Sequence, residues 1–142
     1  MTNVTNRLLL IFSIIGLIVS IYLSYSTLSG IPVKCSLLSG CQTVEQSSYS
    51  RIFGIPVAIF GVLFYLTLIF FVFIRVDKKY QELISKFILY ITTLGFLFSI
   101  YLTYLELYVI YAICMYCVLS AVASTGLFFI SMYENITEYK NY

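Results

Sequence analysis

The stretch from Phe87 to Tyr133, FILYITTLGFLFSIYLTYLELYVIYAICMYCVLSAVASTGLFFISMY, decides the fold of this protein. Glu106 is its only charged residue. An α-helix rises ~1.5 Å per residue, so one straight helix over this stretch would be about 70 Å long, more than twice the hydrocarbon thickness of a bilayer. We therefore predict that the chain reverses near Tyr108 to Ala112 and crosses the membrane twice, although no glycine or proline marks the turn.

Two further apolar stretches precede this one. Leu8 to Leu28 contains no charge, and Ile55 to Ile74 opens with a proline, which the first turn of a helix tolerates. The chain as a whole is 61% hydrophobic and 10% charged, which excludes a soluble monomer and a disordered chain. We predict an all-α integral membrane protein, a four-transmembrane-helix bundle that forms one domain over 1–142, with helices at about 8–28, 55–74, 85–108 and 112–133.

The basic residues of the short loops predict the orientation of the bundle. The side that holds both termini carries Arg7, Arg75, Lys78, Lys79, Lys86 and Lys140, whereas the other side carries Lys34 and Arg51. We therefore expect a multi-pass protein of the cell membrane whose termini are cytoplasmic and whose 29–54 loop faces outward.

The composition also excludes several kinds of chemistry. Histidine is absent, so imidazole bases, histidine-ligated metals and haem axial histidines are excluded. The net charge of +2 is too small for a nucleic-acid-binding surface. We expect the lipid bilayer as a partner, no nucleic acid and no bound metal.

Four cysteines carry the chemical information of the sequence, and all four fall on the predicted outer side, where disulfides persist. Cys35 and Cys41 lie in the 29–54 loop, and Cys114 and Cys117 form a Cys-x-x-Cys motif at the start of the last span. Free backbone N–H groups and the helix dipole stabilise a thiolate at such a position, and one helical turn brings both sulfurs within bridging reach. The arrangement predicts a relay in which an exposed pair receives electrons and a membrane-embedded pair passes them on.

Three alternatives use the same residues differently. The cysteines could form two structural disulfides, although a Cys-x-x-Cys bridge closes almost no chain and adds little stability. They could hold a zinc ion through four thiolates, although one pair lies at the membrane surface. The protein could also be a small four-span transporter with structural disulfides, in which Glu106 carries protons.

The sequence resembles the vitamin K epoxide reductase homologues over about residues 8–133. The motifs that carry the resemblance are Cys35 and Cys41, then Ser47, then Phe53-Gly54-Ile55-Pro56, and finally Cys114-Met115-Tyr116-Cys117. The DsbB-type quinone reductases carry their Cys-x-x-Cys in the earlier outward loop, so the order found here favours the first family. Many prokaryotic members have a fused thioredoxin-like domain, and we expect a member of the prokaryotic type without one, because the chain ends soon after Tyr133.

This resemblance implies a quinone-dependent, disulfide-forming oxidoreductase that supports disulfide formation outside the cytoplasm. Cys35 would exchange with a separate thioredoxin-like protein, secreted or membrane-anchored, and Cys41 would pass electrons to Cys114. Cys117 would deliver them to a membrane quinone of the ubiquinone or menaquinone type. Ser47 would lie near the quinone or the cysteine relay.

Other positions bear on the quinone site. Tyr49 and Phe60 match pocket-lining positions of the family and are expected to contact the quinone, although in a chain with 14 tyrosines and 12 phenylalanines an aromatic residue more often belongs to the core or the interfacial belt. Vertebrate members carry Asn and Tyr where this chain has Val57 and Ala121, which favours a plain quinone over vitamin K epoxide. Glu106 could deliver a proton during quinone reduction, or it could extend to water near the helix end.

Overall fold

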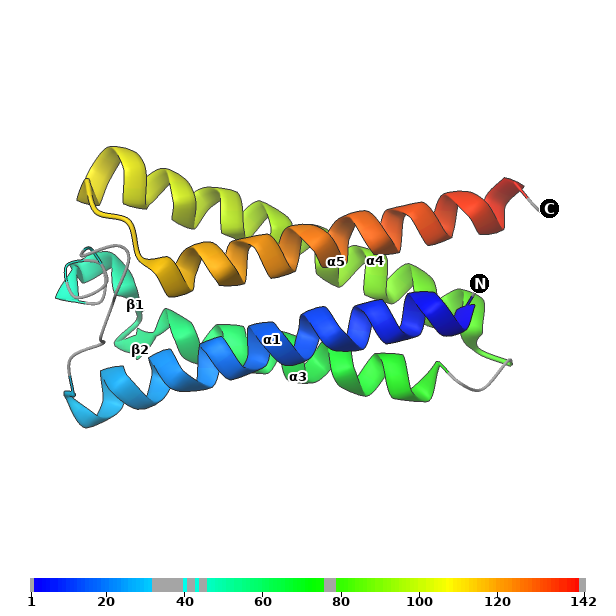
Figure 1. Cartoon of the computed structure of the whole chain (residues 1–142), viewed down its shortest axis with the longest axis horizontal. Helices are drawn as coiled ribbons and strands as arrows, with labels where there is room; N and C mark the ends of the chain where they lie inside the picture. The colour runs from blue at the N-terminus through cyan, green and yellow to red at the C-terminus, as the bar shows by residue number, and fades with distance from the viewer. Residues whose placement is uncertain (1, 32–39, 41–42, 44–45, 76–78, 141–142) are drawn as a thin grey trace.

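A computed structural model describes residues 2–31, 40, 43, 46–75 and 79–140. Its long helices are α1 (Thr2–Ser29), α3 (Val57–Ile74), α4 (Gln81–Tyr104) and α5 (Met115–Lys140). They run up and down beside one another, and both termini lie at the same end (Figure 1). Each is long and apolar enough to cross a membrane, so the predicted four-transmembrane-helix bundle is confirmed.

The helix ends differ from those expected from hydropathy alone. The first helix begins at Thr2 rather than near residue 8, and the last continues to Lys140 rather than ending near residue 133. Helical hydrogen bonding does not stop where the apolar residues stop, because polar residues outside the hydrocarbon layer also adopt helical conformation. α4 begins at Gln81 instead of residue 85 for the same reason.

A short hairpin replaces the expected start of the second span. β1 (Arg51–Ile52) pairs antiparallel with β2 (Ile55–Pro56), so α3 begins at Val57 and not at Ile55. The two residues between the strands, Phe53 and Gly54, have φ angles of 53° and 80°. Left-handed backbone at both positions is what a type I′ two-residue hairpin turn requires.

The third span ends in a widened turn. After α4 the chain continues as a π-helix, η2 (Leu105–Ile110), in which Leu105 and Glu106 are buried. Tyr111 then adopts a left-handed conformation with a φ of 56°, and the chain reaches α5 at Met115. The reversal therefore lies at residues 111–114, slightly beyond the predicted 108–112, and a left-handed tyrosine makes the turn in place of glycine.

The core of the bundle lies in its half nearer the termini. Leu9, Leu68, Ile88 and Leu127, one from each long helix, are almost fully buried there. Two glycines allow close contact between side chain and backbone: a Cβ atom on Gly16 would overlap the Tyr65 ring, and one on Gly95 would overlap the Phe64 ring. Such small residues let membrane helices approach closely.

A buried ion pair closes this end of the bundle. Arg75, directly after α3, pairs with Glu134 of α5, and the two residues are only 2% and 7% exposed. Burial lowers the pKa of the Arg75 guanidinium, and the nearby Glu138 carboxylate opposes that change. From the sequence alone, Arg75 is only one of the loop charges, and its burial was not predicted.

Candidate active site

The half of the bundle farther from the termini contains a cavity of about 520 Å³. It is lined by the C-terminal parts of α1 and α4, the N-terminal parts of α3 and α5, and residues of the 47–50 segment. Most lining side chains are apolar or aromatic, among them Leu23, Phe64 and Phe98. Both the size and the character match a site for an organic ligand of moderate size.

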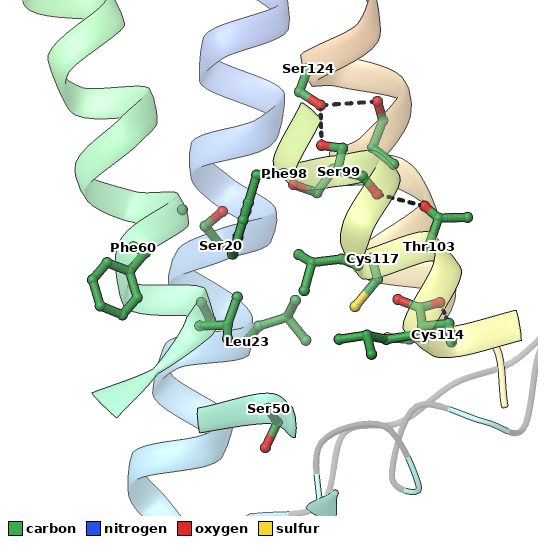
Figure 2. Close-up of a pocket in the computed structure, with 18 of the residues that line it drawn as sticks. Ser20, Leu23, Ser50, Phe60, Phe98, Ser99, Thr103, Cys114, Cys117 and Ser124 are labelled. Atoms are coloured by element: carbon green, nitrogen blue, oxygen red, sulfur yellow. Dashed lines mark hydrogen bonds between the residues drawn. The ribbon is translucent and has the colours of Figure 1, made fainter. Parts of the chain in front are cut away.

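Two thiols form part of the cavity wall. Cys114 directly precedes α5 and is 2% exposed, while Cys117 lies in the first turn of that helix and is half-buried. Both are free cysteines. Figure 2 shows Cys117 on one side of the cavity, with Phe60 of α3 on the other.

The start of α5 stabilises a thiolate at Cys114. A hydrogen bond from the Cys117 thiol, together with the backbone N–H groups of Cys117 and Tyr116, lowers the pKa of Cys114 to about 7, although burial acts in the opposite direction. Near neutral pH a large share of Cys114 is therefore thiolate. The thiolate is the nucleophile in disulfide exchange and a better leaving group than an ordinary cysteine.

Glu106 lies against both cysteines. Its Oε2 atom accepts a hydrogen bond of 3.3 Å from the backbone N–H of Cys114, and its carboxyl group hydrogen-bonds the Cys117 thiol. The residue is 7% exposed. Its side chain is thus buried at the cavity. The expectation that Glu106 extends to water near the helix end is therefore not met.

The other predicted quinone-site residues line the same cavity. Ser47, at the start of the 3-10 helix η1 (Ser48–Ser50), and Tyr49 approach it from the loop side, and Phe60 approaches it from α3. Val57 and Ala121, which lack the hydrogen-bonding groups of the vertebrate members, also line it. The structure therefore brings these residues together with Cys114 and Cys117, while their roles remain predictions.

The cavity also contains a set of hydroxyl groups that was not predicted from the sequence. Ser99 and Ser124 are hydrogen-bonded between helices at 2.6 Å (Figure 2), and Tyr65 bonds Ser120 at 3.0 Å. The sequence feature that could have predicted these hydroxyl groups is their spacing. Ser99 and Thr103 are four residues apart, as are Ser120 and Ser124, and residues four apart share one helix face. That signal is weak, since isolated serine and threonine residues are common in membrane helices.

Cys35 and Cys41, the two predicted loop cysteines, lie outside the described residues. Gly40, which precedes Cys41 in sequence, is described. A Cβ atom at Gly40 would lie 2.5 Å from the carbonyl oxygen of Ile113. The backbone of the loop at Gly40 is therefore in close contact with the backbone that leads directly into Cys114.

A metal centre is not apparent in the described part of the chain. No group of three or more Cys, Asp or Glu side chains there could hold a metal ion. The four-cysteine zinc alternative depends on Cys35 and Cys41, which fall outside that part.

Comparison with known families agrees with these features. A model of the vitamin K epoxide reductase family matches residues 7–132, which is most of the chain. A comparison with curated protein sequences gave no match. The family match, the four membrane-spanning helices and the paired thiols lead to one conclusion: the chain belongs to the vitamin K epoxide reductase family of membrane thiol–disulfide oxidoreductases.

Proposed function

We propose that this oxidoreductase takes electrons from a thioredoxin-like protein and delivers them to a membrane quinone of the ubiquinone or menaquinone type, so that disulfides form outside the cytoplasm. The observation that carries the proposal is the position of Cys114 and Cys117. They lie at the wall of a largely apolar cavity of about 520 Å³ inside the helix bundle. A quinone ring is flat and apolar except for its two carbonyl groups, and such a cavity suits it.

Each step of the proposed relay is a disulfide exchange. The dithiol of the partner reduces the Cys35–Cys41 disulfide by attack on Cys35. The Cys41 thiolate then attacks Cys114 of the Cys114–Cys117 disulfide and releases the Cys117 thiolate. Cys35 attacks Cys41 in the resulting Cys41–Cys114 bridge and releases Cys114, whose pKa of about 7 makes it a good leaving group. The Cys114–Cys117 dithiol then gives two electrons to the quinone and becomes a disulfide again.

The cavity also has a side that a lipid-soluble substrate could use for access. Phe60 of α3 and Leu94 and Phe98 of α4 line the cavity and are each partly exposed on the apolar surface of the bundle. A prenylated quinone could therefore enter between α3 and α4 while its tail stays in lipid. Val57 and Ala121 offer no side-chain hydrogen bond to a head group, which supports a plain quinone over an epoxide substrate.

The proposal is tested with purified protein in detergent, a reduced thioredoxin-like protein with a Cys-x-x-Cys site, and a short-chain ubiquinone or menaquinone. We expect loss of the quinone absorbance and oxidation of the partner in equal amounts. With Cys114→Ser we expect no loss of quinone and at most one equivalent of partner oxidised, by the Cys35–Cys41 disulfide itself. No quinone consumption by the unaltered protein with any such partner would contradict the proposal.

The contact between Gly40 and Ile113 supports the proposed exchange between Cys41 and Cys114, since each cysteine follows one of the contacting residues in sequence. We expect Gly40→Val to slow transfer from the loop pair to Cys114 at least ~10-fold, because a side chain there would displace the loop from the Ile113 backbone. The rate is measured by rapid quenching and mass spectrometry of the cysteine pairs.

The matched control for this loop variant is Gly54→Asn. Apart from its chain neighbours, no atom of the residues that the structure describes lies within 4 Å of a Cβ at Gly54, and asparagine tolerates its left-handed backbone. The control should transfer electrons at the original rate. An unchanged rate in Gly40→Val would show that this contact does not guide the exchange.

The proposed orientation is tested by labelling intact cells. We expect a thiol reagent that cannot cross membranes to modify Cys35 or Cys41 from outside after mild reduction, because the outer side carries fewer basic residues. Labelling only after the membrane is opened to the cytoplasmic side would contradict this orientation, and the site of disulfide formation with it.

A further inference from the structure

We propose that Glu106 is the acid–base residue of the quinone reaction: it accepts the proton of the Cys117 thiol and passes that proton to a carbonyl oxygen of the quinone. This inference rests on the proposed function, because it assigns the proton path of the same reaction. It is carried by the contacts of a buried carboxyl group with both cysteines.

The backbone holds Glu106 in place on its C-terminal side. Its carbonyl oxygen accepts hydrogen bonds from the N–H groups of Tyr111 and Ala112, the latter at 3.1 Å. These bonds close the π-helix η2 and set the left-handed turn at Tyr111. Widened π-type turns inside helices are frequent at functional sites, and this one turns a carboxylate into the bundle at the depth of the thiols.

The side chain is held from α5. Oε2 of Glu106 accepts the backbone N–H of Cys114 at 3.3 Å. The carboxyl group also lies within hydrogen-bonding reach of the Cys117 thiol, whose single proton it shares with the Cys114 sulfur. An amide N–H cannot give up its proton, whereas a thiol can. Of these two partners, only Cys117 can exchange a proton with Glu106.

The surroundings of Glu106 supply no compensating cation among the described residues. The ion pairs formed by these residues are Arg75 with Glu134 and Lys86 with Glu82, both elsewhere in the bundle. The titratable side chains that line the cavity with Glu106 are Cys114, Cys117, Tyr49 and Tyr65, and the Tyr65 hydroxyl is bonded to Ser120 of α5. A buried carboxylate without a cation gains or loses a proton readily when the charge beside it changes.

The proton and electron balance of the step is complete. Before the reaction Cys114 is a thiolate, Cys117 a thiol and Glu106 a carboxylate. Cys117 transfers its proton to Glu106, the two sulfurs join as two electrons pass to the quinone, and Glu106 returns the proton to one quinone oxygen. The second quinone oxygen takes a proton from water at the outer end of the cavity. The products are the Cys114–Cys117 disulfide, the quinol and a carboxylate ready for the next cycle.

The experiment compares Glu106→Gln with Glu106→Asp and with Glu82→Gln. Glu82→Gln is the matched control, since it replaces a carboxylate by an amide in the same way, but at an exposed position of α4. The first readout is alkylation of Cys117 in the reduced, quinone-free protein as a function of pH, followed by mass spectrometry of its peptide. The second readout is the rate of quinone reduction by the same preparations.

We expect Glu106→Gln to reduce quinone at least ~100-fold more slowly, the usual size of a lost acid–base group. In the same variant Cys117 should be alkylated several-fold faster near neutral pH, because the negative charge beside its sulfur is gone. Glu106→Asp should retain part of the rate, and Glu82→Gln should match the unaltered protein in both readouts.

Two outcomes would overturn the inference. One is quinone reduction by Glu106→Gln at the full rate. The other is a slower rate with an unchanged pH profile of Cys117 alkylation, since that result would show that Glu106 has only a structural role. Should Glu106→Gln fail to fold, Glu106→Asp decides in the same two readouts. An unaltered protein that does not reduce quinone would instead refute the proposed function, so the two failures are distinguishable.

Discussion

Replacing Cys117 by alanine is expected to abolish quinone reduction and to accumulate a disulfide between Cys41 and Cys114. Without Cys117 the Cys114 thiolate has no neighbour with which to form its own disulfide. It can only attack the Cys35–Cys41 disulfide at Cys41 and release Cys35, which leaves loop and helix joined. The bridge requires the two Cα atoms to come within about 7 Å. Gly40 and Ile113, the residues that precede Cys41 and Cys114 in sequence, are in backbone contact. Mass spectrometry of non-reduced digests identifies the linked peptides.

The complementary variant is Cys41→Ala. Cys35 then has no partner in its loop to release a bound substrate, so the thioredoxin-like protein should remain attached to Cys35 as a mixed disulfide. This complex is separated by non-reducing electrophoresis. A Cys35–Cys114 bridge in the Cys117→Ala variant, with no Cys41 link, would reverse the roles assigned to the two loop cysteines.

Removal of Glu134 is expected to produce the largest loss of stability. Glu134→Ala leaves the Arg75 guanidinium buried without its carboxylate, and breaking such a buried pair costs about 3–5 kcal/mol of the free energy of unfolding. The measurement is reversible unfolding in mixed detergent and dodecyl sulfate, followed by circular dichroism. Because the pair lies at the opposite end of the bundle from the cysteines, the rate of quinone reduction by the folded fraction should not change.

Two further variants test whether the loss arises from an uncompensated charge. The double variant Arg75→Met with Glu134→Leu removes both charges and should recover most of the stability lost in the single variant. Lys86→Gln breaks an exposed pair on α4, whose N···O distance is 3.1 Å, and should change stability by less than about 1 kcal/mol. A double variant as unstable as Glu134→Ala would mean that packing, and not charge, is the cause.

Hydropathy alone predicted the four spans because a bilayer leaves few choices. Backbone N–H and C=O groups cannot bond to water in hydrocarbon, so each long apolar stretch must be helical. The fold-back of Phe87 to Tyr133 followed from length, and the Cys-x-x-Cys position at the start of α5 followed from the fold-back. Local hydrogen bonding modified the ends: Ile55 and Pro56 pair with β1 in a hairpin instead of beginning α3.

The sequence by itself determined the number of membrane helices, the placement of Cys114 and Cys117 at a helix start, and the family. These depend on residue type and on spacing along one helix. Only the tertiary structure decided that Arg75 is paired inside the bundle with Glu134, and that Glu106 lies against both cysteines. Those contacts join elements whose relative rotation no single-helix pattern specifies, and for Glu106 the rotation depends on a π-helix and a left-handed Tyr111 that no glycine or proline signals.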